Sequence, residues 1–469
     1  MPRNALAELL AGWLPAQRWF AGSGSKVCQV TVTSDVLLAD GDPVLRHLIA
    51  DVLIADEQVR YQVLLGVRRE LPPFLNEAAI GKLPDGRIAY DGATDPALAS
   101  VLLQGIAEHR REGPLRFVRE PGAVINADAS ARTLPALASN TSIVFGEQAI
   151  LKIIRRPFAG HHPDLEVPGV LARNGSALVA APRGWIEMPG SGQVAEVQDP
   201  AAATVAPDAP PAGGAPGGPA AREHAVLAIL SDFFANSSDG WSLATASVVE
   251  AGPGFTEEAA RLGETTAQLH EEMAAGFGAS ALSRHALKDM TDAMEAELRR
   301  AIRIVPSLND YAAGIRACYA ALAESEAQVH VQRIHGDYHL AQVLRTGRGW
   351  IVLDFEGEPS VPLARRRAFA PPLRDVAGML RSFDYAGRHE ALRRPDDARM
   401  QKSSERWVRD CQEAFCAGYA KVSGQDPAQS GPLLRALILQ KAVYESVYEA
   451  SHRPDWLPIP LAAISEASR

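Results

Sequence analysis

The sequence contains little cysteine, no long apolar run and no excess of positive charge. Its cysteines are Cys28, Cys318, Cys411 and Cys416, in a chain of 469 residues, and no Cys-x-x-Cys pair occurs. Cysteines this sparse argue against a disulfide framework and against a cysteine-rich zinc site, and they are typical of proteins in a reducing compartment.

No stretch of the sequence reaches the roughly 18 apolar residues that a membrane-spanning helix requires. The N-terminal segment MPRNALAELLAGWLP also lacks the apolar core and cleavage site of a signal peptide. The net charge of −9 gives no general attraction to nucleic acid or to anionic lipid. We therefore expect a cytoplasmic protein that binds neither nucleic acid nor membrane. A site for an anionic ligand must take its positive charge from individual lysines, arginines or a metal ion.

The segment VQRIHGDYHLAQVLRTGRGWIVLD combines several groups that phosphoryl transfer requires. It contains the motif His335-Gly336-Asp337 and, five residues after the aspartate, the amide Gln342. Two short apolar runs then predict a pair of buried strands, at 343–344 and 350–353. The second of these strands ends at Asp354.

This spacing matches a kinase catalytic loop of the form His-x-Asp-x-x-x-x-Asn. In that loop the aspartate takes the proton of the acceptor hydroxyl, and the amide five residues later binds a metal ion. Asp337 is the predicted base, and Gln342 and Asp354 are the predicted ligands of Mg²⁺, which prefers hard oxygen donors. The alternative interpretation is a buried histidine with two surface acids in a hairpin. The amide and the strand-borne acid at these spacings favour a kinase that uses ATP.

The segment SNTSIVFGEQAILK predicts a strand–turn–strand unit that covers a nucleotide. Small polar residues precede its first strand and can bind phosphate oxygens through hydroxyl and backbone N–H groups, although no Gly-x-Gly-x-x-Gly is present; these residues are Ser139, Asn140, Thr141 and Ser142. Lys152 ends the second strand, where kinases have a lysine that contacts the phosphates. Glu166, from the next predicted helix, is the candidate that orients this lysine. The alternatives are a surface lysine and a solvated acid in the first turn of a helix.

Composition and periodicity predict three parts. The pattern of residues 1–90 predicts a small N-terminal cap domain of mixed α+β structure. The pattern of residues 91–235 predicts a strand-rich kinase N-lobe with the hinge. Residues 236–469 predict a helical C-lobe that contains the catalytic loop and the acceptor site. Within the N-lobe, the segment 189–221 is rich in Pro, Ala and Gly, which predicts a flexible insertion between two strands.

A predicted helix near the C-terminus has polar and aromatic residues at helical spacing. Lys441, Glu445 and Glu449 share one face, and Tyr444 and Tyr448 share another. Aromatic rings offer flat apolar faces to a sugar, and acids accept hydrogen bonds from its hydroxyl groups. The alternative is a surface helix with ion pairs and half-buried tyrosines.

Two further polar residues have predicted structural roles. Asp375 opens a predicted helix, and we expect it to brace the catalytic loop. His270 is expected to be a satisfied core histidine, because it lies within a long amphipathic helical stretch.

Together, several pieces of the chain resemble the maltokinases of actinobacterial type; they are LPAQRWFAG, SNTSIVFGEQAILK, SSDGW, QRIHGDYHLAQVLR, DFEGEP, RDVAGMLRSFDYA, KAVYE and RPDWLPIPL. The resemblance implies an α+β, bilobal fold like that of eukaryotic-type and aminoglycoside kinases, with a small N-terminal cap domain. It also implies ATP- and Mg²⁺-dependent phosphorylation of maltose at the anomeric hydroxyl. The maltose 1-phosphate would feed α-glucan (glycogen) synthesis from trehalose, so a trehalose synthase is a plausible partner. We expect a monomer.

The resemblance also implies roles for matched positions. Asp337 resembles the catalytic base, Gln342, Asp354 and Glu356 the metal ligands, and Lys152 with Glu166 the nucleotide-binding pair. The positions that resemble the sugar-binding side are His335, Tyr338, Gln440, Lys441, Tyr444, Glu445 and Trp456.

Two positions depart from the maltokinase pattern. Gln440 stands where an acid usually precedes the lysine, and Tyr338 stands where leucine is usual. Losing a carboxylate exchanges a charged hydrogen bond of about 1.5–3 kcal/mol for a neutral one of about 0.5–1.5 kcal/mol, which can change the preferred acceptor. The nearest alternative is therefore a glucosamine kinase that forms glucosamine 6-phosphate. Two others are an aminoglycoside kinase, which needs a more acidic cleft, and a non-catalytic pseudokinase scaffold, which needs a broken base or metal site.

Overall fold

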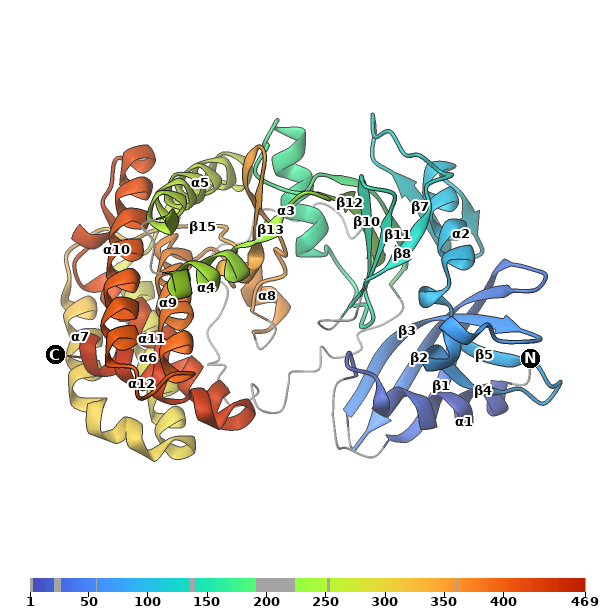
Figure 1. Cartoon of the computed structure of the whole chain (residues 1–469), viewed down its shortest axis with the longest axis horizontal. Coiled ribbons are helices and arrows are strands. Elements are labelled where there is room, and N and C mark those ends of the chain that lie inside the picture. Colours follow the sequence, from blue (N-terminus) through green and yellow to red (C-terminus); the bar gives the residue numbers. More distant parts are fainter. Residues whose placement is uncertain are drawn as a thin grey trace. The chain divides into compact units, whose positions relative to one another are not determined.

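The computed structural model describes residues 3–20, 27–55, 57–134, 140–190, 224–250, 254–358 and 361–468. These residues form two compact units (Figure 1). The first unit comprises described residues of 3–169, 180–190 and 224–235, and the second comprises those of 170–179 and 236–468. None of the described helices is both long and apolar enough to span a membrane.

The first sheet of the first unit has five strands in the order β1-β2-β3-β5-β4. Their bounds are Val27–Ala39 (β1), Val44–Ile54 (β2), Glu57–Arg68 (β3), Ala79–Lys82 (β4) and Ile88–Asp91 (β5). Strands β2 and β3 are buried along most of their length, which is typical of strands covered on both faces. Helix α1 (Arg3–Trp13) shares a core with one face, and α2 (Pro96–Ala107) shares a core with the other.

The second sheet has seven strands in the order β6-β7-β11-β12-β10-β9-β8, all paired antiparallel. Their bounds are Arg111–Glu112 (β6), Leu115–Arg119 (β7), Ala131–Thr133 (β8), Thr141–Phe145 (β9), Ala149–Ile153 (β10), Pro182–Pro189 (β11) and His224–Asp232 (β12). Helix α3 (Pro163–Arg173) follows β10. The predicted insertion at 189–221 falls almost entirely outside the described residues, and the two strands that flank it, β11 and β12, are neighbours.

A buried polar joint connects these two sheets within the first unit. Gln62 on β3 donates from Nε2 to the carbonyl oxygens of Ile154 and Leu227, each at 2.8 Å, and its backbone N–H donates to the carbonyl of Arg155 at 2.9 Å. The His47 ring contacts Oε1 of Gln62 at 2.7 Å, and burial lowers the pKa of His47 to about 4. These hydrogen bonds fix the backbone just after β10, the strand of Lys152.

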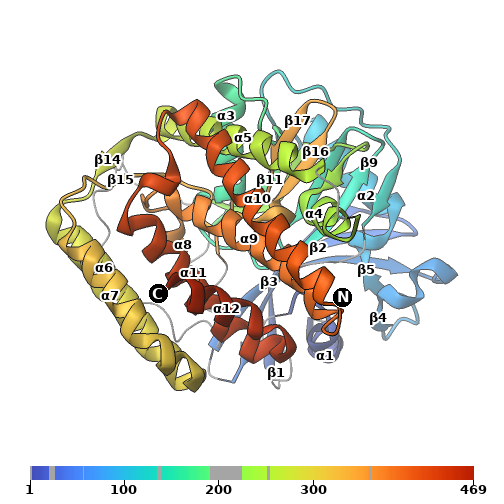
Figure 2. The same cartoon turned by 60° about the vertical axis from the view of Figure 1, so that its left-hand side comes forward.

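The second unit is mainly helical (Figures 1 and 2). Its helices are α4 (Gly240–Glu250), α5 (Gly254–Phe277), α6 (Arg284–Ile304), α7 (Ala312–Glu324), α8 (Leu363–Arg366), α9 (Leu373–Leu392), α10 (Ala398–Ser423), α11 (Pro432–His452) and α12 (Pro458–Ala467). Helices α5 and α10 approach so closely that a Cβ added at Gly263 would lie 2.0 Å from the Phe415 carbonyl oxygen, and one at Gly418 would lie 2.0 Å from that of Ala260. Glycine at both positions therefore allows this helix crossing.

Short strands in the second unit hold the catalytic segment. One sheet has the order β13-β16-β17, and a second pairs β14 with β15. Their bounds are Ser238–Asp239 (β13), Ala279–Ala281 (β14), His330–Gln332 (β15), Val343–Thr346 (β16) and Gly349–Val352 (β17). The predicted hairpin before Asp354 is therefore confirmed as β16 and β17, and the loop with Asp337 lies between β15 and β16.

Short 3₁₀ turns complete the described elements. They are Leu14–Ala16, Pro73–Ala78, Gly92–Thr94, Pro306–Tyr311, Leu340–Gln342, Pro427–Gln429 and Pro454–Trp456.

Candidate active site

The loop that contains Asp337 is braced by Asp375 of α9, as the sequence predicted. The backbone N–H groups of His335 and Gly336 donate to the two carboxylate oxygens of Asp375, at 2.8 and 2.9 Å. His270, which is buried, contacts Asp375 Oδ2 through Nε2 at 3.2 Å and the Tyr419 hydroxyl through Nδ1 at 3.0 Å. Burial alone would raise the pKa of Asp375, but the contacts with His270 and the loop N–H groups hold it below its usual value. Asp375 is therefore an ionised buried brace, and His270 is the satisfied core histidine that was expected.

The side chain of His335 connects this loop to the residue before Asp354. Its Nε2 donates to the Leu353 carbonyl at 2.8 Å, and its Nδ1 accepts the N–H of Asp337 at 3.3 Å. The ring is buried and lies 4.9 Å from the Phe355 ring, centroid to centroid. Through these contacts His335 positions the loop and the residue before Asp354. Its predicted contact with the acceptor remains a prediction.

The carboxylate of Asp337 lies beside two cationic or titratable groups. Lys441 Nζ on α11 is 3.5 Å from Oδ1, and His339 Nε2 is 3.8 Å from Oδ2. Burial would raise the pKa of Asp337, but Lys441 and His339 outweigh this and hold the pKa below its usual value. Lys441 is itself 2.7 Å from Glu358 Oε1, and its two carboxylate partners raise its pKa although burial lowers it. Asp337 is thus ionised at neutral pH and held close to a fixed positive charge.

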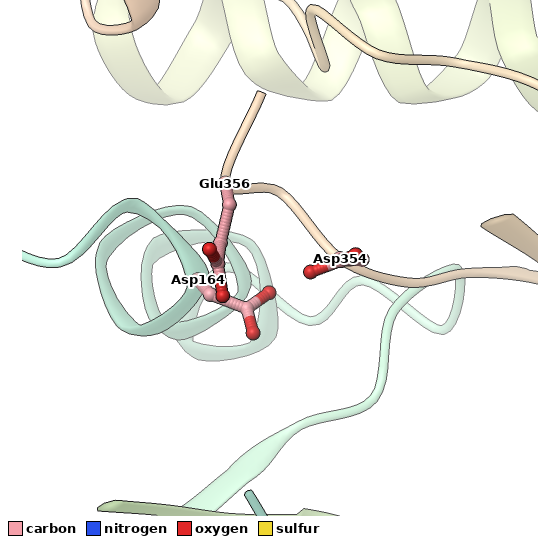
Figure 3. A group of neighbouring side chains, drawn as sticks. All are labelled: Asp164, Asp354 and Glu356. Atoms are coloured by element: carbon pink, nitrogen blue, oxygen red, sulfur yellow. The ribbon is translucent and has the colours of Figure 1, made fainter. Parts of the chain in front are cut away.

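Asp354 and Glu356 follow β17 on one short segment, and Figure 3 shows their carboxylates. An oxygen of one lies within 4.8 Å of an oxygen of the other. Asp354 has a backbone φ of 61°, a left-handed value that is uncommon for residues other than glycine and that aspartate tolerates better than most. Gln342 Nε2 donates to Asp354 Oδ2 at 3.2 Å, so the predicted amide and acid are adjacent. Two carboxylates and a rotatable amide form an oxygen-rich donor set, which fits Mg²⁺.

A narrow pocket adjoins Asp337 within the second unit. It is bounded by the catalytic loop, α6, α9 and α11, and its lining includes four of the predicted acceptor-side residues: Tyr338, Gln440, Lys441 and Tyr444. Lys441 Nζ lies 5.0 Å from the centre of the Tyr444 ring. Tyr338 is buried, and its hydroxyl shares a hydrogen bond of 3.0 Å with Thr266 Oγ1. Its hydroxyl is therefore engaged within the protein.

Two other predicted acceptor residues are not part of this lining. Glu445 is paired with Arg381, whose Nη2 lies 2.7 Å from Oε2. Burial raises the pKa of Glu445, against the lowering effect of Arg381. Trp456 stacks with Arg453, whose Cζ is 4.3 Å from the ring centre, and packs on His389. A role for these two side chains in sugar binding remains a prediction.

The predicted nucleotide residues of the first unit lie on β9, β10 and α3. Lys152 on β10 is paired with Ser142 across the strands, so both side chains project from one face of the sheet. The Lys152 ammonium group donates to Asp164 Oδ2 at 2.9 Å. Asp164 lies in the first turn of α3 and is also labelled in Figure 3.

Glu166 lies in the same turn of α3, and its pairing with Lys152 remains a prediction. Asp164 was not anticipated, although it precedes the predicted Glu166 by only two positions. Thr141 accepts a hydrogen bond from Arg155 Nε at 2.9 Å and is buried. Asn140 immediately precedes β9, and Ser139 lies outside the described residues.

Three charged residues line the pocket without having been predicted: Glu297 of α6, Glu358 and Arg374. Glu297 had a usable signal in the sequence. It lies within the buried stripe of α6 that includes Met294, Leu298 and Ala301, where an acid is unusual. Glu358 and Arg374 had no such signal, because charged residues in a loop or near the start of a helix are common.

The chain matches two protein-family descriptions. Residues 13–95 match the maltokinase N-terminal cap domain, and residues 131–423 match the phosphotransferase enzyme family.

Two curated relatives are glucosamine kinases. The one from Streptacidiphilus jiangxiensis is 28% identical over 388 residues, which cover 77% of this chain and 81% of the relative. The one from Mycolicibacterium smegmatis is 27% identical over 266 residues, which cover 51% of this chain and 62% of the relative. A solved glucosamine kinase in complex with glucosamine, ADP and inorganic phosphate superimposes with a TM-score of 0.66 at 22% identity, covering 98% of both chains.

These findings confirm the resemblance to maltokinase-like kinases, the α+β kinase fold with an N-terminal cap, and the enzyme class. The cap and the phosphotransferase match together support an ATP-dependent carbohydrate phosphotransferase.

Proposed function

The chain belongs to the phosphotransferase enzyme family, and from this premise we propose that it transfers the γ-phosphoryl group of ATP to a hydroxyl group of glucosamine. The observation that carries the proposal is the pocket beside Asp337. There the predicted base is adjacent to a polar wall that includes the half-buried Gln440 and Lys441 and the buried Glu297. Such a wall of hydrogen-bond donors and hydrogen-bond acceptors suits a small sugar with several hydroxyl groups. The two glucosamine kinases among the relatives support this choice of acceptor.

Asp337 acts as the base in this proposal. Its depressed pKa keeps it ionised, so it accepts a hydrogen bond from the acceptor hydroxyl and orients that oxygen for attack. The transition state of phosphoryl transfer is loose, so the proton need move to Asp337 only late in the reaction. Lys441 holds the Asp337 carboxylate in place and offsets its negative charge as the phosphoryl group approaches.

Asp354, Glu356 and Gln342 supply the oxygen donors that would hold Mg²⁺. When bound, the metal neutralises charge on the ATP phosphates and polarises the phosphoryl group that is transferred. The left-handed backbone at Asp354 and the His335–Leu353 hydrogen bond fix the direction of the Asp354 carboxylate. Lys152, oriented by Asp164, is proposed to contact the phosphates, as the lysine of the third strand does in protein kinases.

Maltose is the second candidate acceptor. The match of residues 13–95 to the maltokinase cap favours it. In that case the product would be maltose 1-phosphate for α-glucan synthesis, with a trehalose synthase as partner. These points, the monomeric state and the cytoplasmic location remain predictions. A pseudokinase is disfavoured because Asp337, Gln342, Asp354 and Lys152 are all present.

The test is ADP release with ATP and Mg²⁺ in the presence of glucosamine, maltose, glucose, trehalose or an aminoglycoside, followed by ³¹P NMR of the product. The proposal expects the highest kcat/KM with glucosamine and a phosphomonoester on a sugar hydroxyl. A preference for maltose with an anomeric phosphate would select the second candidate. Absence of acceptor-dependent ADP release with every sugar would contradict both.

A further inference from the structure

One wall of the acceptor pocket is formed by a side-chain pair that joins two helices. Gln440 of α11 donates from Nε2 to Glu297 Oε2 of α6, at 2.8 Å. Both residues line the pocket that contains Asp337. Glu297 is 91% buried, since only 9% of it is exposed, so this carboxylate is removed from bulk water while it adjoins the site of the reaction.

The charge of Glu297 is poorly compensated. Burial raises its pKa to about 7, and the hydrogen bond from Gln440 reduces this effect only in part. Its charged surroundings are mixed, because Arg374 and Arg300 favour ionisation while Glu358 opposes it. Gln440 is neutral and cannot supply a counter-charge. Within the described residues, no hydrogen bond engages the second oxygen of Glu297, Oε1.

We propose that Glu297 is the residue that selects an amino sugar: together with Gln440 it binds the amino group of the acceptor while Asp337 takes the hydroxyl proton. The inference rests on the proposed function and assigns its specificity to a residue of α6. The unengaged Oε1 of Glu297 accepts an N–H of the ammonium group, and the Gln440 amide, whose Nε2 is committed to Oε2, presents its own oxygen as a second acceptor.

This arrangement distinguishes amino sugars from neutral sugars by charge. An ammonium group supplies the positive charge that the buried Glu297 lacks, and charge-assisted hydrogen bonds are about twice as strong as neutral ones. A hydroxyl at the same position of a neutral sugar donates one hydrogen bond and brings no charge. The preference therefore arises at Glu297 itself and leaves the phosphoryl chemistry at Asp337 unchanged.

A purely structural role for Glu297 predicts a different outcome. If the Glu297–Gln440 hydrogen bond only joined α6 to α11, its loss would affect all acceptors to the same extent. Glu297→Gln is the appropriate variant, because glutamine has nearly the same shape and can still accept a hydrogen bond from Gln440. The matched control is Glu295→Gln, on the same helix, where the carboxylate is partly exposed and pairs with Arg316 at 3.0 Å.

The experiment measures kcat and KM for glucosamine and for glucose with the wild-type enzyme and both variants, and binding of glucosamine to each by calorimetry. We expect Glu297→Gln to reduce kcat/KM for glucosamine about 30-fold, mainly through KM. The value for glucose should change by less than about 3-fold, and Glu295→Gln should resemble the wild type.

Equal losses with both sugars, or no loss with glucosamine, would overturn the inference. So would a wild-type enzyme that phosphorylates glucose or maltose in preference to glucosamine, although the sugar-kinase function would then stand. If no sugar supports ADP release by the wild-type enzyme, the proposed function itself fails. Calorimetry then tests the role of Glu297 separately. If Glu297 binds the amino group, glucosamine must bind the wild type more tightly than it binds Glu297→Gln, and equal binding would contradict that role.

Discussion

The catalytic loop and the acceptor pocket lie side by side, but they are held in different ways. The loop is fixed through its backbone: Asp375 accepts two main-chain N–H groups, and His335 donates to the main-chain carbonyl before Asp354. The pocket wall is formed by side chains, of which Glu297 and Gln440 come from different helices.

This difference between the loop and the pocket wall explains how one catalytic loop can be combined with pockets for different sugar acceptors. Because Asp375 and His335 hold the loop through its main chain, substitutions at Glu297 or Gln440 should leave Asp337 in position. A wall made of long side chains from α6 and α11 can change by one residue without disturbing the loop. Loss of the base should therefore reduce turnover with every acceptor, whereas a change in the wall should alter the choice of acceptor.

The largest effect is expected at the base. Asp337→Asn should lower kcat by about 10³-fold, within the range of about 10²–10⁴ for loss of a general base. Binding of ATP, measured by calorimetry, should stay within about 3-fold of the wild type, because Asp337 contacts the acceptor side in this account. Retained turnover with normal nucleotide binding would contradict the assignment of the base.

Burial of Glu297 in the pocket wall should make the stability of the folded protein depend on pH. The pKa of Glu297 is about 7 in the folded protein, above the ordinary glutamate value of 4.5, so its protonated form is favoured on folding. The stabilisation from that neutral form is complete below pH 4.5 and is lost as the pH rises through 7. Glu297→Gln is neutral at every pH, so it should be more stable than the wild type at pH 8, by up to about 3 kcal/mol.

Urea unfolding at pH 8 and at pH 5 measures this difference. The gain should be largest at pH 8 and small at pH 5. A gain that is independent of pH, or a loss at pH 8, would show that Glu297 is not strained by burial.

The loop should respond to a change in the helix that supports it. A Cβ added at Gly378 of α9 would lie 2.6 Å from the Tyr338 carbonyl oxygen, so Gly378→Ala must displace the loop. We expect kcat to fall about 10-fold with all acceptors, about 1.4 kcal/mol in the barrier. Gly12→Ala is the control, because nothing lies within 4 Å of the added Cβ. Unchanged kcat for Gly378→Ala would show that the loop tolerates movement.

The smallest effect is expected at Asp164, and it tests whether Asp164 or Glu166 orients Lys152. Asp164→Asn should raise KM for ATP about 5-fold, since it removes the carboxylate that lies 2.9 Å from Lys152 Nζ. Glu166→Gln is the matched comparison from the same turn of α3. A larger effect of Glu166→Gln would restore the original sequence-based pairing of Lys152.

Local patterns in the sequence predicted several elements that carry the candidate site. The catalytic motif, the hairpin before Asp354 and the strand that ends near Lys152 depend on residues close together in the chain, where spacing determines geometry. The brace at Asp375 was predicted as well, because kinase folds often have a buried acid beneath the catalytic loop. The cap and kinase fold followed from motifs spread along the whole chain.

Contacts between residues far apart in the chain could not be predicted from spacing in the sequence. Glu297 and Gln440 are 143 positions apart, and only the packing of α6 against α11 brings them together. Helical spacing placed Glu445 on the same face as Lys441, but it could not show that Arg381 of α9 binds Glu445. The choice between Asp164 and Glu166 depends on which side of α3 faces β10, and the sequence spacing leaves that rotation open.

A single reaction with ATP, Mg²⁺ and glucosamine, followed by ³¹P NMR and ADP measurement, tests the proposed phosphoryl transfer in the wild type and in Asp337→Asn. We expect one sugar phosphomonoester for each ADP with the wild type and almost none with Asp337→Asn. Release of ADP without a sugar phosphate, or an equal yield from both proteins, would contradict it.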